Sequence, residues 1–244
     1  MDLRSRAKER APRTPNGVRI YAIGDVHGRA DLLGEVVRRI DAHNEANPAP
    51  QSVEVFLGDY VDRGPQSRQV LDILTLRQRQ RQMICLKGNH ETYITEFLRN
   101  PSSLARWKAF GGLETLVSYG LRPTFDPDEA EQRELATELD RTLPQAHRRF
   151  FSGLPISFSC GDYFFAHAGV RPGVPLQLQQ QDDLLLIRQD FLRHDKAFGK
   201  IIIHGHTPVT EPETRFNRIN IDTGAYATGK LTCLVLEGES VSFL

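Results

Sequence analysis

The 244-residue sequence predicts a single domain of the mixed α/β class, and three observations carry that prediction. Short apolar runs recur along the chain, as buried strands do. Segments with the 3.6-residue period of helices separate the first of these runs. Each run also stops abruptly at a Gly or small residue beside Asp, His or Asn, as in Val18–Gly28, Val53–Pro65, Met83–Glu91, Tyr163–Gly169 and Lys200–Pro208.

Taken in order, the chain begins with residues 1–17, which hold five basic and two acidic residues and two prolines. This composition predicts a disordered tail, with a docking arm for an acidic partner as the alternative. A strand from Val18 and a helix over Ala30–His43 follow, and the helix carries an apolar stripe. After the strand at Val53, a second helix is predicted over Ser67–Gln82, so the segment indicates βαβ units.

The middle of the chain differs, because Glu91 to Gly161 contains no convincing strand. We expect a helical insertion over about residues 92–157 that lies against the mouth of the site, with a charged, solvent-facing helix at Glu129–Thr142. Strands then return at the end of the chain, over 163–165, 200–203, 220–222 and 231–236. Residues 18–244 are therefore interpreted as one domain with a helical insertion.

Composition narrows the class of protein. The formal net charge is zero, so no overall field draws the chain to nucleic acid or to a membrane, and neither is expected as a partner. The three cysteines lie in or beside apolar runs and are expected to be free thiols. The sequence contains no run of 18 consecutive apolar residues, so no membrane-spanning helix is expected, and no secretory signal is evident. A cytoplasmic location is expected.

Polar residues at the ends of the five runs form one candidate metal site. They contribute carboxylate, amide and imidazole groups without a thiolate, a set that favours Mn, Fe or Zn over soft metals. Six ligands exceed what one catalytic ion with open positions would use, and they suit two ions that share a bridging carboxylate. The six residues are Asp25, His27, Asp59, Asn89, His167 and His206.

These residues lie in motifs that resemble those of the calcineurin-like metallophosphoesterases, and more narrowly the bacterial and phage form of the phosphoprotein phosphatases. The motifs are GDVHG (24–28), GDYVDRG (58–64), GNHE (88–91), AHAG (166–169) and GHTP (205–208), in the family's order. The resemblance runs from about residue 18 to about 236. It implies a two-layer β-sandwich flanked by helices, the α/β-β-α architecture, where periodicity alone indicates only a mixed α/β domain.

The resemblance also implies a role for each residue. Asp25 and His27 would bind a first metal ion, Asp59 would bridge two ions, and Asn89, His167 and His206 would complete the second. His204 is a neighbour that strand alternation could also turn towards the site, but the family's pattern assigns the ligand role to His206. Both ions would be divalent, with manganese favoured and iron or zinc as alternatives.

A hydroxide bound to the two ions is the expected nucleophile, because a cation lowers the pKa of bound water. The absence of a G-x-S-x-G motif and of a cysteine in a polar motif agrees with this. His90 is the expected general acid, and Asp62 is expected to orient it and to keep it protonated. Arg63 and, in a weaker match, Arg188 are expected to bind the phosphoryl oxygens. Tyr226 would lie at the rim of the site.

The favoured hypothesis is a metal-dependent phosphomonoesterase that acts on phosphoserine or phosphothreonine in proteins or peptides. The alternative is a hydrolase of symmetric dinucleoside tetraphosphates or of small phosphorylated metabolites. Asp62 favours the first hypothesis over the second. A nucleotide leaving group needs less help from a proton, and the nucleotide hydrolases typically replace this residue, whereas this chain retains it. A non-catalytic scaffold that binds phosphopeptides is a third reading, disfavoured because no ligand residue is missing.

Overall fold

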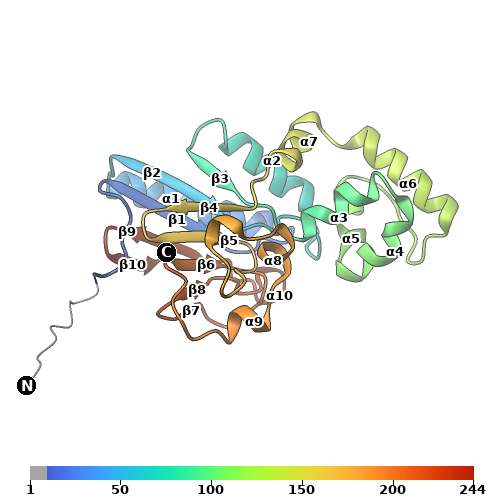
Figure 1. The fold of residues 1–244 in the computed structure, drawn as a ribbon. Coiled ribbons are helices and arrows are strands. Elements are labelled where there is room, and N and C mark those ends of the chain that lie inside the picture. Colours follow the sequence, from blue (N-terminus) through green and yellow to red (C-terminus); the bar gives the residue numbers. More distant parts are fainter. Residues whose placement is uncertain (1–9) are drawn as a thin grey trace, which may run out of the picture.

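The computed structural model describes residues 10–244 and contains two five-stranded sheets packed face to face, with helices on the outer sides (Figure 1). This arrangement confirms the predicted α/β sandwich. The first sheet has the order β10-β9-β1-β2-β3. Its strands are β1 (Val18–Ile23), β2 (Gln51–Phe56), β3 (Met83–Cys85), β9 (Cys233–Glu237) and β10 (Ser240–Phe243). The second has the order β4-β5-β6-β8-β7, with β4 (Ser157–Cys160), β5 (Tyr163–Ala166), β6 (Ile201–His204), β7 (Glu213–Thr214) and β8 (Arg218–Asn220).

Parallel strands linked by helices form the centre of the first sheet, as predicted. Strand β2 pairs in parallel with both β1 and β3. The connections are α1 (Ala30–Ala46) and α2 (Ser67–Arg77), so the first helix is three residues longer than predicted and the second five residues shorter. Alternate residues of β1 face opposite sides, with Ile20 and Ala22 packed between the sheets and Tyr21 and Ile23 packed under the helices.

The second sheet combines parallel and antiparallel pairs. β5, β6 and β8 run parallel to one another, whereas β4 and β7 pair antiparallel with β5 and β8 at the two edges. Its outer face packs against η3 (Leu176–Leu178), α8 (Gln181–Leu186) and α9 (Gln189–Leu192). The sequence did not predict β4, β7 or β10, and these strands are short and partly or wholly exposed, so they lack a clear apolar signal.

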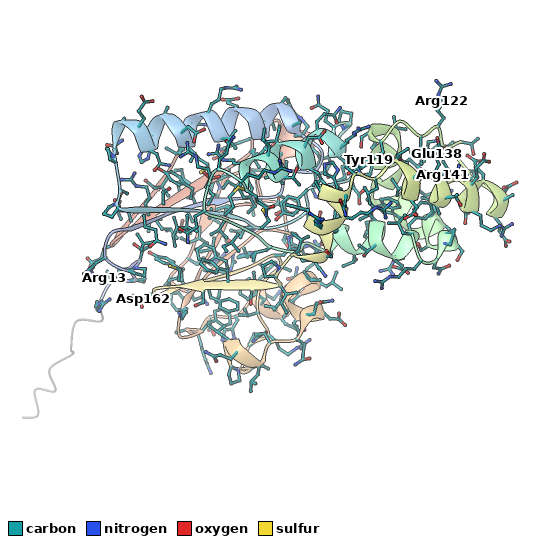
Figure 2. The ribbon with its side chains drawn as sticks, turned by 90° about the horizontal axis from the view of Figure 1, so that it is seen from above. Arg13, Tyr119, Arg122, Glu138, Arg141 and Asp162 are labelled. Atoms are coloured by element: carbon teal, nitrogen blue, oxygen red, sulfur yellow. The ribbon has the colours of Figure 1, made fainter. Side chains whose placement is uncertain are left out.

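Helices fill the chain between β3 and β4 and extend away from the sheets (Figures 1 and 2). They are α3 (His90–Phe97), η1 (Pro101–Ser103), α4 (Leu104–Trp107), η2 (Lys108–Phe110), α5 (Gly112–Ser118), α6 (Glu129–Thr142) and α7 (Gln145–Ser152). Helix α6 has the predicted bounds, begins where the Asp128 side chain accepts the Glu131 amide N–H, and buries only Leu135, Ala136 and Leu139. The remaining helix, α10 (Ala225–Thr228), lies beside the strand ends of both sheets.

Residues 10–17 do not form the disordered tail that was predicted for residues 1–17. The Thr14 side chain is buried, and its backbone N–H donates to the Gly238 carbonyl at 3.0 Å. The Arg13 N–H donates to Asp162 at 2.9 Å, and the two residues lie together in Figure 2. Backbone groups make these contacts, which explains why composition missed them. Residues 1–9 lie outside the described part of the chain, and within residues 10–244 no helix is long and apolar enough to cross a membrane.

A buried ion pair ties the first sheet to its helices. Glu54 on β2 is 1% exposed, and both of its carboxylate oxygens accept hydrogen bonds from Arg77 on α2, at 2.6 and 2.7 Å. Arg77 also donates to Asp41 on α1, at 2.9 and 3.0 Å. Burial raises the pKa of Glu54, against the opposing effect of Arg77. The guanidinium therefore balances a carboxylate that water cannot reach.

We predict that Arg77→Met lowers the free energy of unfolding by about 3–5 kcal/mol, because it leaves Glu54 buried without its counter-ion. A raised folded-state pKa means that the folded protein binds the proton more tightly than the unfolded chain. The loss should therefore be larger at pH 8 than at pH 5. Urea unfolding of Arg77→Met and of Arg81→Met, which alters an exposed partner of the same Asp41, tests this. Equal losses from the two variants would contradict it.

Candidate metal centre

The six predicted metal ligands meet at one place, where the carboxyl ends of strands from both sheets converge beside α3, α8 and α10 (Figure 1). Each follows a strand, and each is at most 9% exposed. Carboxyl ends of parallel strands are where open α/β sheets place their sites. The structure thus brings together Asp25 and His27 after β1, Asp59 after β2, Asn89 after β3, His167 after β5 and His206 after β6.

Asp59 lies at the centre of this group. Its Oδ2 is 3.5 Å from Nε2 of His27, and its Oδ1 is 3.4 Å from Nε2 of His167. That His167 nitrogen is also 3.0 Å from Oδ1 of Asn89 and 3.2 Å from Nδ1 of His206. The two oxygens of one carboxylate therefore face two separate sets of donor atoms, as a bridging ligand between two ions must.

Strained backbone marks the same residues. In the described chain, the five non-glycine residues with positive φ are His27, Asp59, Asp62, Arg63 and His206, at 44° to 71°. This region of φ is costly for residues with a Cβ, and it clusters at functional sites when the surrounding structure imposes it. All five belong to the predicted site, so the fold holds these side chains in orientations that a relaxed loop would not give.

Asp25 provides the test of whether a cation fits. Its Oδ2 accepts the His206 backbone N–H at 3.1 Å, whereas its Oδ1 is buried without a hydrogen-bond partner. Burial and the nearby Asp222 raise the pKa of Asp25 well above its usual value. Gly205 permits the close approach, because a Cβ there would lie 2.1 Å from the same Oδ1. An unpaired buried oxygen among imidazoles fits a divalent ion.

The histidines are oriented by their second nitrogens. Nδ1 of His27 donates to the Val61 carbonyl and Nδ1 of His167 to the Leu57 carbonyl, both at 3.0 Å, so Nε2 of each faces Asp59. Burial lowers the pKa of His27 to about 3, which leaves a neutral imidazole. Burial acts the same way on His167, but Asp59 and Asp25 outweigh it and raise its pKa to about 10. The proton on His167 offsets the negative charge of these two carboxylates, which a bound divalent ion would offset in its place.

His90 and Asp62 form a pair beside this cluster. Nδ1 of His90 lies 2.7 Å from Oδ2 of Asp62, and both side chains are buried. Burial opposes protonation, but Asp59 and Asp62 raise the pKa of His90 above its usual value. The Asp62 carboxylate also accepts hydrogen bonds from Trp107 Nε1 at 2.8 Å and from Thr115 Oγ1 at 2.6 Å. The helical segment thus holds the residue that orients His90.

Sequence reasoning missed Trp107, Thr115 and Glu91. Trp107 and Thr115 lie in helices without a motif, so no local signal indicated their contact with Asp62. Glu91 is the last residue of the GNHE motif, and that motif was the signal that could have identified it. Its carboxylate accepts three backbone N–H groups, from Gly88 and Asp59 at 2.9 Å and from Tyr60 at 2.8 Å. These contacts lock the turn after β2 to the turn after β3.

A cavity of about 210 Å³ opens over the cluster, and it brings both predicted phosphate-binding arginines to the site. Arg63 and Arg188 line it together with His90, Phe110 and Tyr226. The cavity is also lined by Asp222, a buried acid that the sequence analysis does not assign to the site. His204 lies elsewhere: its ring centroid is 4.8 Å from that of Phe191, and its Nε2 faces Arg218, so the structure does not bring it into the cluster.

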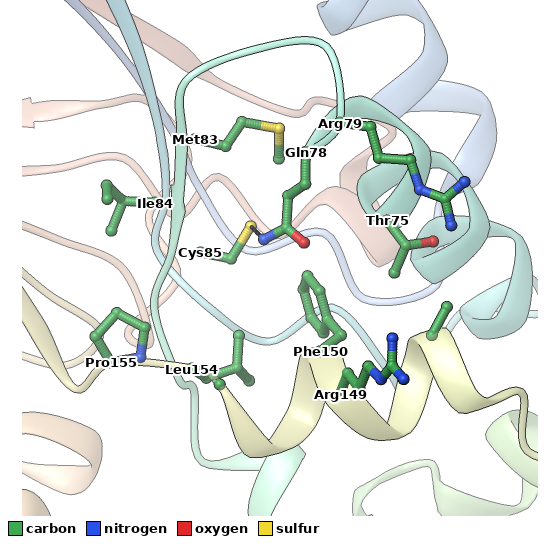
Figure 3. A pocket seen from close by; sticks show the side chains of 12 residues that line it. Thr75, Gln78, Arg79, Met83, Ile84, Cys85, Arg149, Phe150, Leu154 and Pro155 are labelled. Carbon is green, nitrogen blue, oxygen red and sulfur yellow. Dashed lines mark hydrogen bonds between the residues drawn. The ribbon is translucent and has the colours of Figure 1, made fainter.

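A hollow of about 310 Å³ in the described chain shares only Arg188 with this cavity, and two larger ones share no residue with it. One of about 600 Å³ lies between α2, β3 and α7, and Figure 3 shows Gln78 beside Cys85 within it. Another, of about 780 Å³, lies between the helical segment and α8. Neither gathers carboxylates and imidazoles around one point, so the smaller cavity at the strand ends is the candidate site.

Comparison with known proteins agrees with this geometry. The family described as calcineurin-like phosphoesterase matches residues 18–233. The bis(5'-nucleosyl)-tetraphosphatase PrpE [asymmetrical] of Anoxybacillus flavithermus is 27% identical over 90% of this chain and 91% of its own length. The protein of the same name from Oceanobacillus iheyensis is 26% identical over 88% and 87%. A crystal structure provisionally described as a diadenosine tetraphosphatase has a TM-score of 0.62 at 18% identity, over 96% of this chain and 98% of that one.

These relatives overturn one prediction. The sequence analysis favoured a phosphorylated protein as substrate because Asp62 is retained, and that prediction is wrong: the curated relatives named above match along most of the chain and are tetraphosphatases by name. The structure supplies a physical reason. Asp62 anchors Trp107 and Thr115 as well as His90, so its presence follows from packing and does not report the leaving group.

We predict opposite effects of Asp25→Asn on stability and on metal binding. Without metal, the variant should be more stable by about 1–3 kcal/mol, because a neutral amide replaces a buried carboxylate with an unpaired oxygen. Its affinity for Mn²⁺ should fall by at least about tenfold, as even residues behind metal ligands cost that much. Thermal unfolding with and without Mn²⁺ measures both effects. Unchanged affinity would contradict the site, and exposed Asp190→Asn is the control.

Proposed function

The chain belongs to the calcineurin-like phosphoesterase family and is a metallophosphoesterase hydrolase, and from that premise we propose that it cleaves bis(5'-nucleosyl) tetraphosphates unequally. The observation that carries the proposal is the pair of guanidinium groups, Arg63 and Arg188, in one cavity with the Asp59-centred cluster. The names of the relatives support the substrate class. Unequal cleavage of a four-phosphate bridge releases a nucleoside monophosphate and a nucleoside triphosphate.

Asp25, His27, Asp59, Asn89, His167 and His206 would hold the divalent ions. When bound, such ions lower the pKa of water and offset the negative charge of phosphate, which is the chemistry that hydrolysis of a phosphoanhydride requires. The donor set of oxygen and imidazole groups suits manganese, iron or zinc.

The chain's own cationic groups suit a polyphosphate. Guanidinium groups bind phosphate oxygens through paired hydrogen bonds, and Arg63 and Arg188 face the same space from different elements. They would hold the phosphate chain on both sides of the reacting phosphorus and keep the bond in line for attack.

His90 would donate its proton to the departing oxygen. Asp62 holds Nδ1, which leaves Nε2 directed at the cluster, 3.8 Å from Oδ2 of Asp59. Asp59 and Asp62 raise the pKa of His90, which favours the protonated imidazole that a general acid requires. A nucleoside triphosphate is a weakly basic leaving group, so the proton helps less there than with an alkoxide.

The direct test is the product pattern from diadenosine tetraphosphate with Mn²⁺-loaded protein. We expect equal amounts of AMP and ATP by chromatography. Arg188→Ala should lower kcat/KM by at least about tenfold, since it removes a charge-assisted contact with the substrate. Arg171→Ala, which alters a half-exposed arginine paired with Asp183, is the control and should change little. Two ADP molecules as products, or no hydrolysis, would refute the proposal.

The role of His90 is tested by the choice of leaving group. His90→Asn should lower kcat for an alkyl phosphate far more than for p-nitrophenyl phosphate, because only the alkoxide needs a proton to depart. Steady-state rates for both substrates in the same Mn²⁺ buffer give the comparison. Equal losses would show that His90 acts by positioning or charge instead of as an acid.

A further inference from the structure

Two aromatic side chains border the candidate site and remain partly open to solvent. Phe110, at the end of η2, is 37% exposed, and Tyr226, on α10, is 39% exposed. Both line the cavity that contains Arg63 and Arg188. Among the other exposed phenylalanines of the described chain, none lines this cavity. The site therefore offers cationic groups for phosphate beside accessible aromatic rings.

Phe110 is supported from beneath by a second ring. It stacks on Tyr93 with ring centroids 5.1 Å apart and planes 14° from parallel. Tyr93 is 6% exposed, and the guanidinium of Arg106 lies 5.3 Å from its centroid. The two rings, Phe110 and Tyr93, are called the aromatic shelf below. A shelf formed in advance loses little conformational freedom when a planar ligand stacks on it.

The backbone fixes the shelf relative to a phosphate-binding group. Gly111, next to Phe110, has φ of 90°, and its carbonyl accepts the backbone N–H of Arg63 at 3.2 Å. A Cβ at Gly111 would lie 2.4 Å from that nitrogen, so only glycine allows this contact. The Arg63 guanidinium covers one side of Tyr226, with Cζ 4.6 Å from the ring centroid. Of the two exposed rings that line the cavity, Phe110 is therefore the one that stacks on another aromatic residue, whereas Tyr226 faces a guanidinium.

The position of the shelf matches the geometry of unequal cleavage. The Phe110 ring centroid is 6.2 Å from that of His90, which stands beside the reacting phosphorus in the proposed function. When a tetraphosphate bridge is cut unequally, one nucleoside is joined directly to the phosphate at the broken bond. Equal cleavage would place both nucleosides one phosphate further away. A nucleobase only a ribose away from that phosphate can reach a ring at the rim.

We propose that the aromatic shelf is the subsite for the nucleobase nearest to the broken bond, with Phe110 as the stacking surface; the inference rests on the proposed function and extends it to base recognition. Every nucleobase has a π face, so stacking favours nucleotides over phosphates that lack a base, without selecting one base. Phosphate binding by Arg63 and Arg188 is shared by all phosphorylated ligands. The base contributes an additional interaction that depends on Phe110.

Binding of AMP and of ribose 5-phosphate isolates this contribution, because the two ligands differ only in the base. Calorimetry with Mn²⁺-loaded wild-type protein should show AMP bound about ten- to hundredfold more tightly, the range found for base–aromatic stacking. Phe110→Ala should remove that difference and leave ribose 5-phosphate unaffected. Phe110→Leu keeps apolar contact with Tyr93 but lacks the π face, and it should behave like alanine. Phe110→Trp should retain the preference.

Phe216→Ala is the matched control, because Phe216 is 66% exposed and lies outside the cavity. Equal affinity of wild type for the two ligands, or a preference that survives Phe110→Ala, would overturn the inference. O-phosphotyrosine is measured in parallel: dependence on Phe110 for this ligand but not for AMP would also overturn it. If the protein forms AMP and ATP from diadenosine tetraphosphate but binds AMP no more tightly than ribose 5-phosphate, the subsite alone is refuted. A Phe110-dependent preference without dinucleotide hydrolysis would refute the proposed function alone.

Discussion

The arrangement of the site depends on one carboxylate, that of Asp59, buried where the two sheets meet. Its oxygens face imidazoles from two different sheets, and its backbone N–H is held by Glu91. Gly88 passes so close that a Cβ there would lie 2.2 Å from Oδ1. Desolvation makes such a group costly unless positive charge surrounds it. The proton on His167, whose pKa is raised to about 10, supplies positive charge beside Asp59, and the ions that the site would hold would supply more. The two sheets therefore pack around a carboxylate that needs a positive partner.

That requirement explains where the strain and the unpaired groups occur. Positive φ at His27, Asp59 and His206 directs their side chains towards one point, at an energetic cost that the packed sheets must offset. The unpaired oxygen of Asp25 adds a further cost. Sites adapted to bind a ligand commonly sacrifice stability in this way. The helical segment contributes on the other side, since Trp107 and Thr115 hold Asp62 and Gly111 contacts Arg63.

Sequence patterns predicted most of the fold and the convergence of the site because both depend on local signals. Apolar runs that end in Asp, His or Asn mark strand ends, and five such ends from both sheets do meet. Other predictions failed where the deciding contact is distant in sequence. The hydrogen bonds of Asp62 to helices more than 40 residues away were invisible, and so its presence was read as a sign of substrate. The exposed strands β7 and β10 lacked the apolar alternation that reveals a buried strand.

The most direct test of this account is a crystal structure of the protein with Mn²⁺, with the ions located by their anomalous scattering. The account predicts two ions on opposite sides of the Asp59 carboxylate, each bound to one of its oxygens, with Asp25 and His27 on one ion and Asn89, His167 and His206 on the other. A single ion that does not contact Asp59, or ions bound elsewhere on the chain, would contradict it.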